Sequence, residues 1–199
     1  MIKTAVLVSG GGTNLQAILD GIQGGSVQNC QVVLVVSSKA GAYALERAKV
    51  AGIETAVCSG KDVDSHHYDI ELISLLRKHD VELVVLAGFM RILGPTFIAA
   101  YRDAILNVHP SLIPSFCGKG FYGLRVHKAV LEAGVKLTGA TVHFVNEIPD
   151  GGRILLQKAV KVYPSDTPEK LQQRVMKQAE YKLLPQAVSE FCMGKYKNI

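Results

Sequence analysis

Residues 3–14 read Lys3-Thr4-Ala5-Val6-Leu7-Val8-Ser9-Gly10-Gly11-Gly12-Thr13-Asn14. An apolar run leads directly into three glycines, and a segment with helical periodicity follows them. A strand without polar alternation is typically buried on both faces, as in a parallel sheet covered by helices. This stretch therefore predicts the first strand–turn–helix unit of an open α/β sheet.

The same alternation continues along the chain and predicts one domain. Further apolar runs lie at residues 31–38, 82–87 and 104–108. Helical periodicity fills the gaps at residues 14–21, 42–51, 65–78 and 94–101. Because strand–helix–strand units form right-handed crossovers between parallel strands, we expect an open, mainly parallel, twisted sheet flanked by helices.

The pattern changes in the last third of the chain. A loop rich in glycine and aromatic residues is expected over 115–123, followed by a helix over 123–133. Two strands are predicted at 137–145 and 153–162, and they could add an antiparallel pair to the sheet.

A final helix is predicted to begin after Thr167, which would be its N-cap, with Pro168 in the first turn. It is expected to run towards residue 193, with a break or kink at Pro185.

The composition excludes a disordered chain, because 48% of the 199 residues are hydrophobic and 20% are charged. The net charge of +5 favours anionic small molecules but does not by itself indicate nucleic acid. The apolar runs are strand-sized, whereas a membrane span needs ~20 residues, and the N-terminus lacks a signal-peptide pattern. The four cysteines are widely spaced and lack metal-ligand spacing. We therefore predict a cytoplasmic protein with reduced thiols, no metal, and no binding to nucleic acid or membrane.

The glycine-rich turn is the first candidate site. Its glycines allow close approach to a ligand, and the next helix N-terminus offers free N–H groups beside Thr13 and Asn14. This arrangement favours a phosphate ligand. The dinucleotide fingerprint does not fit, because its third glycine would fall at Leu15, and no P-loop lysine follows. A plain tight turn is the alternative interpretation.

The second candidate is the end of the strand predicted at 104–108. Asn107 and His109 are two residues apart, so their side chains point to one face of that strand. Ligands of open α/β sheets bind at this end of the strands. An Asn amide can stabilise a developing oxyanion, and a His can do the same or move a proton. The alternative is an N-capping Asn and a surface His.

Asp150 is the third candidate and lies in a glycine-rich turn. Near His109 its carboxylate would favour the imidazolium form and orient the ring, although an Asp in such a turn is often only a turn former. Cys117 has no local base and is expected to be a loop thiol rather than a nucleophile.

One cluster has a metal-like composition, with the residues Asp62, Asp64, His66 and His67. It lies where a helix is predicted to start, and acids at that position cap the helix. We therefore favour the cap over a metal site.

In this order, the three segments closely resemble the folate-dependent phosphoribosylglycinamide formyltransferase family. The matching strings are residues 8–18, Leu86-Ala87-Gly88-Phe89-Met90-Arg91-Ile92-Leu93, Leu106-Asn107-Val108-His109-Pro110-Ser111-Leu112-Ile113-Pro114, residues 139–145 and residues 150–152. The resemblance spans nearly the whole chain. It implies a Rossmann-like α/β fold in one domain over residues 1–199, with a nucleotide-binding half over about 1–100. The catalytic and folate-binding half, about 101–199, would contain the antiparallel pair.

The resemblance also implies roles for individual residues. The catalytic residues would be Asn107, His109 and Asp150. The ribotide-binding residues would be Gly12, Thr13, Asn14, Gly88, Met90, Pro110 and Glu180. The folate-binding residues would be His66, Met90, Arg91, Ile92, Leu93, Asn107, Val145 and Asp150. His143 would either orient Asp150 or be a satisfied buried histidine.

The implied reaction is formyl transfer from 10-formyltetrahydrofolate, a cosubstrate, to the amine of glycinamide ribonucleotide in purine biosynthesis. No metal and no covalent enzyme intermediate would be needed. The partners would be these small molecules, and the chain would act as a monomer or homodimer.

Four features depart from the family pattern. Arg153 occupies a position that is usually Pro, which loosens the turn after Asp150. His66 lies near a position that is often Arg, and Tyr181 replaces a usual His. The segment from Val175 to Glu180 is one residue longer than usual.

Other formyl-folate enzymes share this type of domain and provide the alternatives. Methionyl-tRNA formyltransferase would need a further C-terminal domain, and a formyltetrahydrofolate hydrolase usually has an N-terminal regulatory domain; we expect neither here. A non-catalytic folate- or nucleotide-binding module would be expected to lack part of the implied catalytic group, whose residues are all present.

The absence of convincing ligand spacing predicts an activity that is independent of metal. Dialysis against EDTA should leave the formyl-transfer rate unchanged in a spectrophotometric assay. A loss of rate that zinc or magnesium restores would contradict this prediction.

Overall fold

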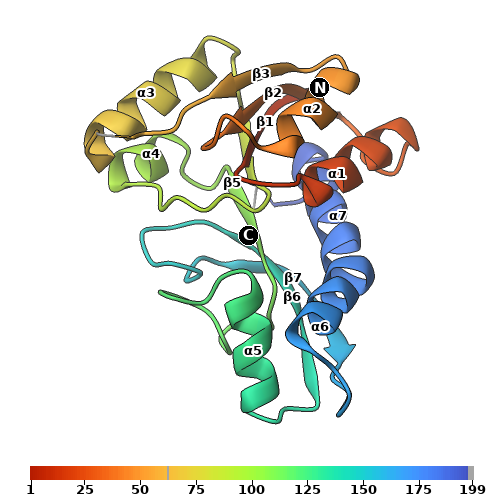
Figure 1. Cartoon of the computed structure of the whole chain (residues 1–199). Coiled ribbons are helices and arrows are strands. Elements are labelled where there is room, and N and C mark those ends of the chain that lie inside the picture. Colours follow the sequence, from red (N-terminus) through yellow and green to blue (C-terminus); the bar gives the residue numbers. More distant parts are fainter. Residues whose placement is uncertain (62, 197–199) are drawn as a thin grey trace.

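The computed structural model describes residues 1–61 and 63–196. These residues form a seven-stranded sheet of order β3-β2-β1-β4-β5-β6-β7 (Figure 1). The strands are β1 (Ile2–Val8), β2 (Cys30–Ser37), β3 (Glu54–Val57), β4 (Leu83–Leu86), β5 (Ile105–His109), β6 (Leu137–Phe144) and β7 (Ile154–Lys161). Strands β1 to β5 are parallel, while β6 and β7 pair antiparallel. The predicted fold class is confirmed, including the antiparallel pair.

Helices cover both faces of this sheet, as continuous apolar strands require. They are α1 (Thr13–Gln23), α2 (Tyr43–Val50), α3 (Ser65–Arg77), α4 (Pro95–Ala100), α5 (Leu124–Glu132), α6 (Pro168–Val175) and α7 (Tyr181–Cys192). In Figure 1, α3 and α4 lie on one side, and α1, α2 and α7 on the other. Along β1, Ala5 and Leu7 pack towards α3 and α4, whereas Val6 and Val8 pack into the opposite core.

Strand β3 was not among the strands predicted from the sequence. Its two end residues are exposed and its two central residues are half-buried, and it forms one edge of the sheet. Short edge strands need no long apolar run, so they lack the signal that identified the buried strands.

The expected break at Pro185 is wrong. Pro185 lies buried inside α7, and the irregular turn is a π turn, Met176–Glu180, between α6 and α7. The backbone N–H of Tyr181 donates to the carbonyl of Met176, five residues back. The π turn therefore shifts the i→i−4 ladder just before the proline, and the helix continues through it.

Two predicted helix caps are confirmed. Asp64 accepts a hydrogen bond from the backbone N–H of His67 at 3.0 Å, and Thr167 accepts one from that of Lys170 at 3.3 Å. Asp62, from the metal-like cluster, lies outside the described residues.

Within residues 1–61 and 63–196, no group of three or more His, Cys, Asp or Glu side chains could hold a metal ion. Nor does any helix there have the length and apolar character that crossing a membrane requires.

Gly139 offers a test of the β6–β7 pairing. A Cβ at this position would lie 2.0 Å from the carbonyl oxygen of Lys158 on β7. Gly139→Ala should lower the free energy of unfolding by about 1–3 kcal/mol in urea denaturation, because backbone must move. Gly41→Ala, where a Cβ would meet no atom within 4 Å, should stay within about 0.5 kcal/mol of wild type. Equal stabilities for both variants would contradict this packing.

Candidate functional site

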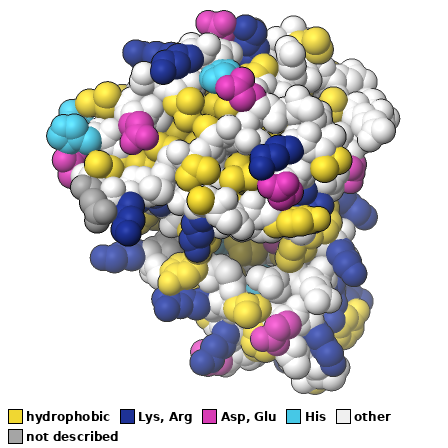
Figure 2. All heavy atoms as spheres, turned by 45° about the horizontal axis from the view of Figure 1, so that its top comes forward, with side chains coloured by type: hydrophobic (Ala, Val, Ile, Leu, Met, Phe, Trp, Pro, Cys, Tyr) yellow, Lys and Arg dark blue, Asp and Glu magenta, His cyan; other side chains and the backbone are white. Residues whose placement is uncertain are grey.

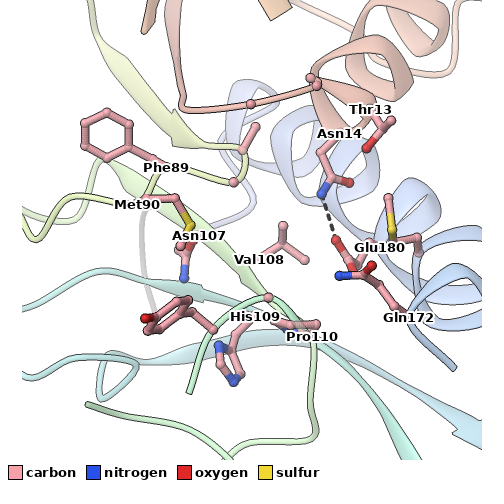
Figure 3. Close-up of a pocket in the computed structure, with 18 of the residues that line it drawn as sticks. Thr13, Asn14, Phe89, Met90, Asn107, Val108, His109, Pro110, Gln172 and Glu180 are labelled. Atoms are coloured by element: carbon pink, nitrogen blue, oxygen red, sulfur yellow. Dashed lines mark hydrogen bonds between the residues drawn. The ribbon is translucent and has the colours of Figure 1, made fainter. Parts of the chain in front are cut away.

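A cavity of about 310 Å³ opens at the carboxyl ends of β1, β4 and β5. Its lining comes from the glycine-rich turn, the segment after β4, the end of β5, the loop before α5, and the helices α5 and α6 (Figure 3). Figure 2 shows a hollow across the middle of the molecule, with Lys and Arg side chains at both of its ends. This is the position at which open α/β sheets bind ligands.

The glycine-rich turn leaves a helix N-terminus open to this cavity. Gly12 is the N-cap of α1 and has a φ of 71°, and a Cβ there would lie 2.6 Å from that of Ala44. Glycine therefore fits both the left-handed conformation and the close contact with α2. Because a glycine N-cap has no side chain to bind the first N–H groups of α1, these donors can bind an anion.

Asn14 and Glu180 face each other across one end of the cavity (Figure 3). Asn14 Nδ2 donates to Glu180 Oε2 at 2.7 Å, and both side chains are buried. Burial raises the pKa of the Glu180 carboxyl, and the hydrogen bond from Asn14 opposes that shift. The predicted residue Glu180 thus reaches the glycine-rich turn from a segment 166 residues away.

His109 lies between two hydrogen-bond acceptors. Its Nε2 is 2.9 Å from the carbonyl oxygen of Phe116, and its Nδ1 is 3.4 Å from Asp150 Oδ2. A carbonyl and an ionised carboxylate can only accept, so both contacts are favourable when both ring nitrogens carry protons. Both ring nitrogens of His109 thus face acceptor atoms.

His143 holds the amide of Asn107. His143 Nδ1 donates to the carbonyl of Phe144 at 2.8 Å, which leaves Nε2 to accept from Asn107 Nδ2 at 3.1 Å. Burial lowers the pKa of His143 and thus also favours the neutral ring. Its Nε2 is 3.7 Å from Asp150 Oδ1, which is longer than a hydrogen bond. His143 is thus a partnered buried histidine that also orients a residue of the cleft.

The turn after β6 positions the carboxylate of Asp150 next to His109. Asp150 has a φ of 57°, and its Oδ2 accepts from the backbone N–H of Gly118 at 2.8 Å. Gly152 allows the chain to turn so tightly, because a Cβ there would lie 1.7 Å from the carbonyl oxygen of Phe144. Burial, followed by the charge of Asp150, raises the pKa of the Cys117 thiol, which favours the inert loop thiol expected from the sequence.

A second cavity of about 150 Å³ adjoins the first and shares Phe89, Asn107 and Asp150 with it. The second cavity contains most of the predicted folate residues, namely Arg91, Ile92, Leu93, Asn107, Val145 and Asp150. The first contains Met90 and the predicted ribotide residues Gly12, Thr13, Asn14, Gly88, Pro110 and Glu180. Asn107 and Asp150 thus line both cavities.

Two predicted folate residues are engaged elsewhere. His66 is not among the residues that line the two cavities. Its Nδ1 lies 3.1 Å from Thr96 Oγ1. Arg91 lines the second cavity, but its Nη1 donates to the carbonyl of Ser59 at 2.6 Å. Its guanidinium also lies over the ring of Tyr68, 4.2 Å from the ring centroid. Folate contacts by His66 stay a prediction.

Several residues of the first cavity were not among the predicted site residues. They are Phe89, Phe121, Tyr122, His127, Gln172 and Met176. Gln172 and Met176 precede Glu180 by eight and four residues, so helical spacing from Glu180 could have identified them. Phe89 lies between the predicted residues Gly88 and Met90, so its position could also have been anticipated. Phe121, Tyr122 and His127 carry no local signal, because only the folded loop and α5 bring them to the cavity.

The sequence and the fold are similar to those of known proteins. The family model described as formyl transferase matches residues 2–188. A chloroplastic phosphoribosylglycinamide formyltransferase of Arabidopsis thaliana is 44% identical and aligns with 98% of this chain and 67% of its own length. The phosphoribosylglycinamide formyltransferase of Haemophilus influenzae is 41% identical, with 98% of this chain and 89% of that protein covered.

Among solved structures, glycinamide ribonucleotide transformylase 1 from Symbiobacterium toebii has a TM-score of 0.90 at 41% identity. That comparison covers 98% of this chain and 89% of the solved one. The chain spans only 14% to 19% of the animal proteins named trifunctional purine biosynthetic protein adenosine-3 that it also matches.

The buried carboxyl of Glu180 predicts a pH-dependent stability. Because its folded-state pKa is raised, ionisation opposes folding, and the free energy of unfolding should fall as pH rises above the ordinary value of 4.5. Glu180→Gln should remove this loss, so its stability relative to wild type should increase with pH in urea denaturation between pH 4 and 8.

Glu169→Gln is a control for which we expect the opposite pH dependence of stability. Hydrogen bonds at the start of α6 lower the pKa of the Glu169 carboxyl, so its ionisation favours folding. The stability of this variant relative to wild type should decrease as pH rises. A flat or falling difference for Glu180→Gln would contradict the assignment of a desolvated carboxyl.

Proposed function

The chain belongs to the formyl transferase family, and from this premise we propose that it transfers a formyl group from 10-formyltetrahydrofolate to glycinamide ribonucleotide. The acceptor is the amine of N1-(5-phospho-D-ribosyl)glycinamide, and the products are its N-formyl derivative and tetrahydrofolate. The observation that carries the proposal is the meeting of two cavities at Asn107 and Asp150. A two-substrate transfer needs two sites that share the reacting centre.

The first cavity suits a phosphorylated acceptor. The phosphate would bind the N-terminus of α1 beside Thr13 and Asn14, where free N–H groups and the helix dipole favour an anion. Glu180 would accept hydrogen bonds from the ribose hydroxyls, since its carboxylate lines the same cavity next to Asn14. The amine would then reach the end of β5, where Asn107 and His109 lie.

The second cavity suits the ring system of the folate. Ile92, Leu93 and Val145 supply apolar lining, and residues 146–149 complete one side of the cavity. Arg153 lies near the turn that closes this cavity, where its guanidinium stacks 5.0 Å from the ring centroid of Phe144. This contact offers support to a turn that lacks the usual proline.

The chemistry follows from these positions. The amine attacks the formyl carbon, and negative charge develops on the formyl oxygen in a tetrahedral intermediate. The Asn107 amide and the His109 imidazolium would donate hydrogen bonds to that oxygen, and removal of one such donor typically costs about 3 kcal/mol. His109 Nε2 now donates to the carbonyl of Phe116, so the oxyanion would replace that acceptor.

Asp150 would act on the proton and on His109. Its carboxylate lies beside His109 Nδ1 and stabilises the imidazolium. It also borders both cavities, so it can accept a proton from the attacking amine, directly or through water, and return it to the leaving nitrogen.

The proposal also includes the location, the metal independence and the oligomeric state that the sequence predicts. It would be a cytoplasmic enzyme that needs no metal and acts on small molecules as a monomer or homodimer. A hydrolase that uses water as acceptor is less well supported, because water would leave the helix N-terminus and Glu180 of the first cavity without a role.

Purified protein with 10-formyltetrahydrofolate provides the direct test, with glycinamide ribonucleotide or water alone as acceptor. Rapid formation of tetrahydrofolate that depends on the ribonucleotide is expected. Equal rates with and without it would favour the hydrolase, and no reaction would favour a non-catalytic binding module.

The contact between His109 and Asp150 predicts coupled kinetic losses. His109→Ala and Asp150→Asn should each lower kcat about 10²–10³-fold with smaller changes in KM, because the interactions strengthen as the oxyanion forms. The double variant should lose much less than the product of the single losses, since the two residues act as a unit. A double-mutant cycle on kcat/KM measures this coupling.

His79→Ala is a control, because His79 pairs with Glu54 at 3.7 Å away from both cavities. It should retain wild-type kinetics. If the losses at His109 and Asp150 multiply fully, the two side chains act independently and the mechanism above is incorrect.

A further inference from the structure

His127 is a buried histidine whose ring has no hydrogen-bond partner. It lies on the inner face of α5 and is 0% exposed. Neither Nδ1 nor Nε2 meets a partner among the described residues. A buried polar group without a partner costs about 1–3 kcal/mol, so such a ring in a native fold requires an explanation.

The location of unpartnered groups points to a ligand. Three described residues have buried side-chain nitrogen or oxygen atoms without a partner, namely Asn14, His127 and Thr138. Asn14 and His127 line the first cavity, whereas Thr138 lies at the start of β6 and lines neither of the two cavities. Two of these three residues would therefore gain partners from a molecule bound in the first cavity.

The ring of His127 is neutral in this environment. Burial, followed by the nearby His109, lowers the pKa of His127 to about 4. A neutral imidazole offers one N–H donor and one nitrogen acceptor, so it matches an amide or hydroxyl group better than a phosphate dianion. The dipolar group suited to the phosphate lies at the N-terminus of α1 instead.

We propose that His127 is a substrate-positioning residue that hydrogen-bonds an uncharged amide or hydroxyl group of the acceptor. The proposal rests on the function proposed above and assigns His127 to the acceptor rather than the folate. His127 lines the first cavity beside His109 and Pro110 but does not line the second. The acceptor contains a glycinamide amide and ribose hydroxyls, and either group could pair with both nitrogens, directly or through one ordered water.

Kinetics and direct binding of three variants test this role. His127→Leu removes both hydrogen-bonding atoms, whereas His127→Asn and His127→Gln keep an amide near the positions of Nδ1 and Nε2, respectively. His127→Leu should raise the KM and the calorimetric Kd for glycinamide ribonucleotide about tenfold or more. The KM for 10-formyltetrahydrofolate should change less than twofold, and Asn or Gln should restore part of the acceptor affinity.

Thermal stability separates this role from a structural one. Because His127→Leu removes a desolvated group without a partner, the free protein should keep or raise its Tm. Thr138→Val is the matched control, since it also removes a buried unpartnered atom but lies away from both cavities. It should keep or raise Tm and leave both KM values unchanged.

The two chemical groups of the acceptor can be distinguished with analogues. Glycinamide without the ribose phosphate, and ribose 5-phosphate without the glycinamide, can each be titrated into wild type and His127→Leu at high concentration. If His127 pairs with the amide, only glycinamide binding weakens in the variant; if it pairs with a hydroxyl, only ribose 5-phosphate binding weakens.

Other results would overturn the assignment. Wild-type acceptor affinity in His127→Leu would do so, as would equal changes in the KM of both substrates. If the Leu variant does not fold, a loss of acceptor affinity in the Asn or Gln variant without a matching loss of folate affinity supports the proposal, whereas wild-type acceptor affinity in both variants, or equal losses for both substrates, opposes it. A wild-type protein that forms no product with the ribonucleotide would refute the proposed function itself, and this inference with it.

Discussion

The pairing of Asn107 with His143 across β5 and β6 determines the geometry of the cleft. The two residues lie opposite each other in the antiparallel ladder, which brings Asn107 Nδ2 within 3.1 Å of His143 Nε2. The ladder ends one residue later, and the following turn returns Asp150 to His109. Because a slip of one residue would turn every side chain of a strand to its other face, the whole reacting group depends on this register.

This framework gives the three neighbouring histidines different environments. His109 lies between a carbonyl and a carboxylate, whereas burial lowers the pKa values of His143 and His127. His109 is thus the histidine whose two ring nitrogens both face acceptors, and it lines the first cavity together with Asn107 and Asp150. Negative charge that develops on a substrate oxygen beside it would be stabilised by a donor held in place by these contacts.

The sequence predicted those elements of the fold that depend on residues close together in the chain. Continuous apolar runs identified the buried strands, and Asp64 and Thr167 were recognisable as caps, since each feature depends on residues close together in the chain. Strand β3 was missed because edge position and half-burial arise only from neighbouring strands. The contact of Asp150 with His109 joins residues 41 apart in sequence, so the spacing alone could not predict it; the family resemblance supplied that pairing.

The π turn shows how a local irregularity keeps a distant contact. Four residues exceed one α-helical turn of 3.6, so in a straight helix each step of four, from Gln172 to Met176 and on to Glu180, would turn the side chain further around the axis. The wider π turn at Met176–Glu180 nearly closes in that span and keeps all three residues on the cavity. It thereby keeps Glu180 within hydrogen-bond distance of Asn14, whereas Pro185 lies beyond the turn and can remain helical.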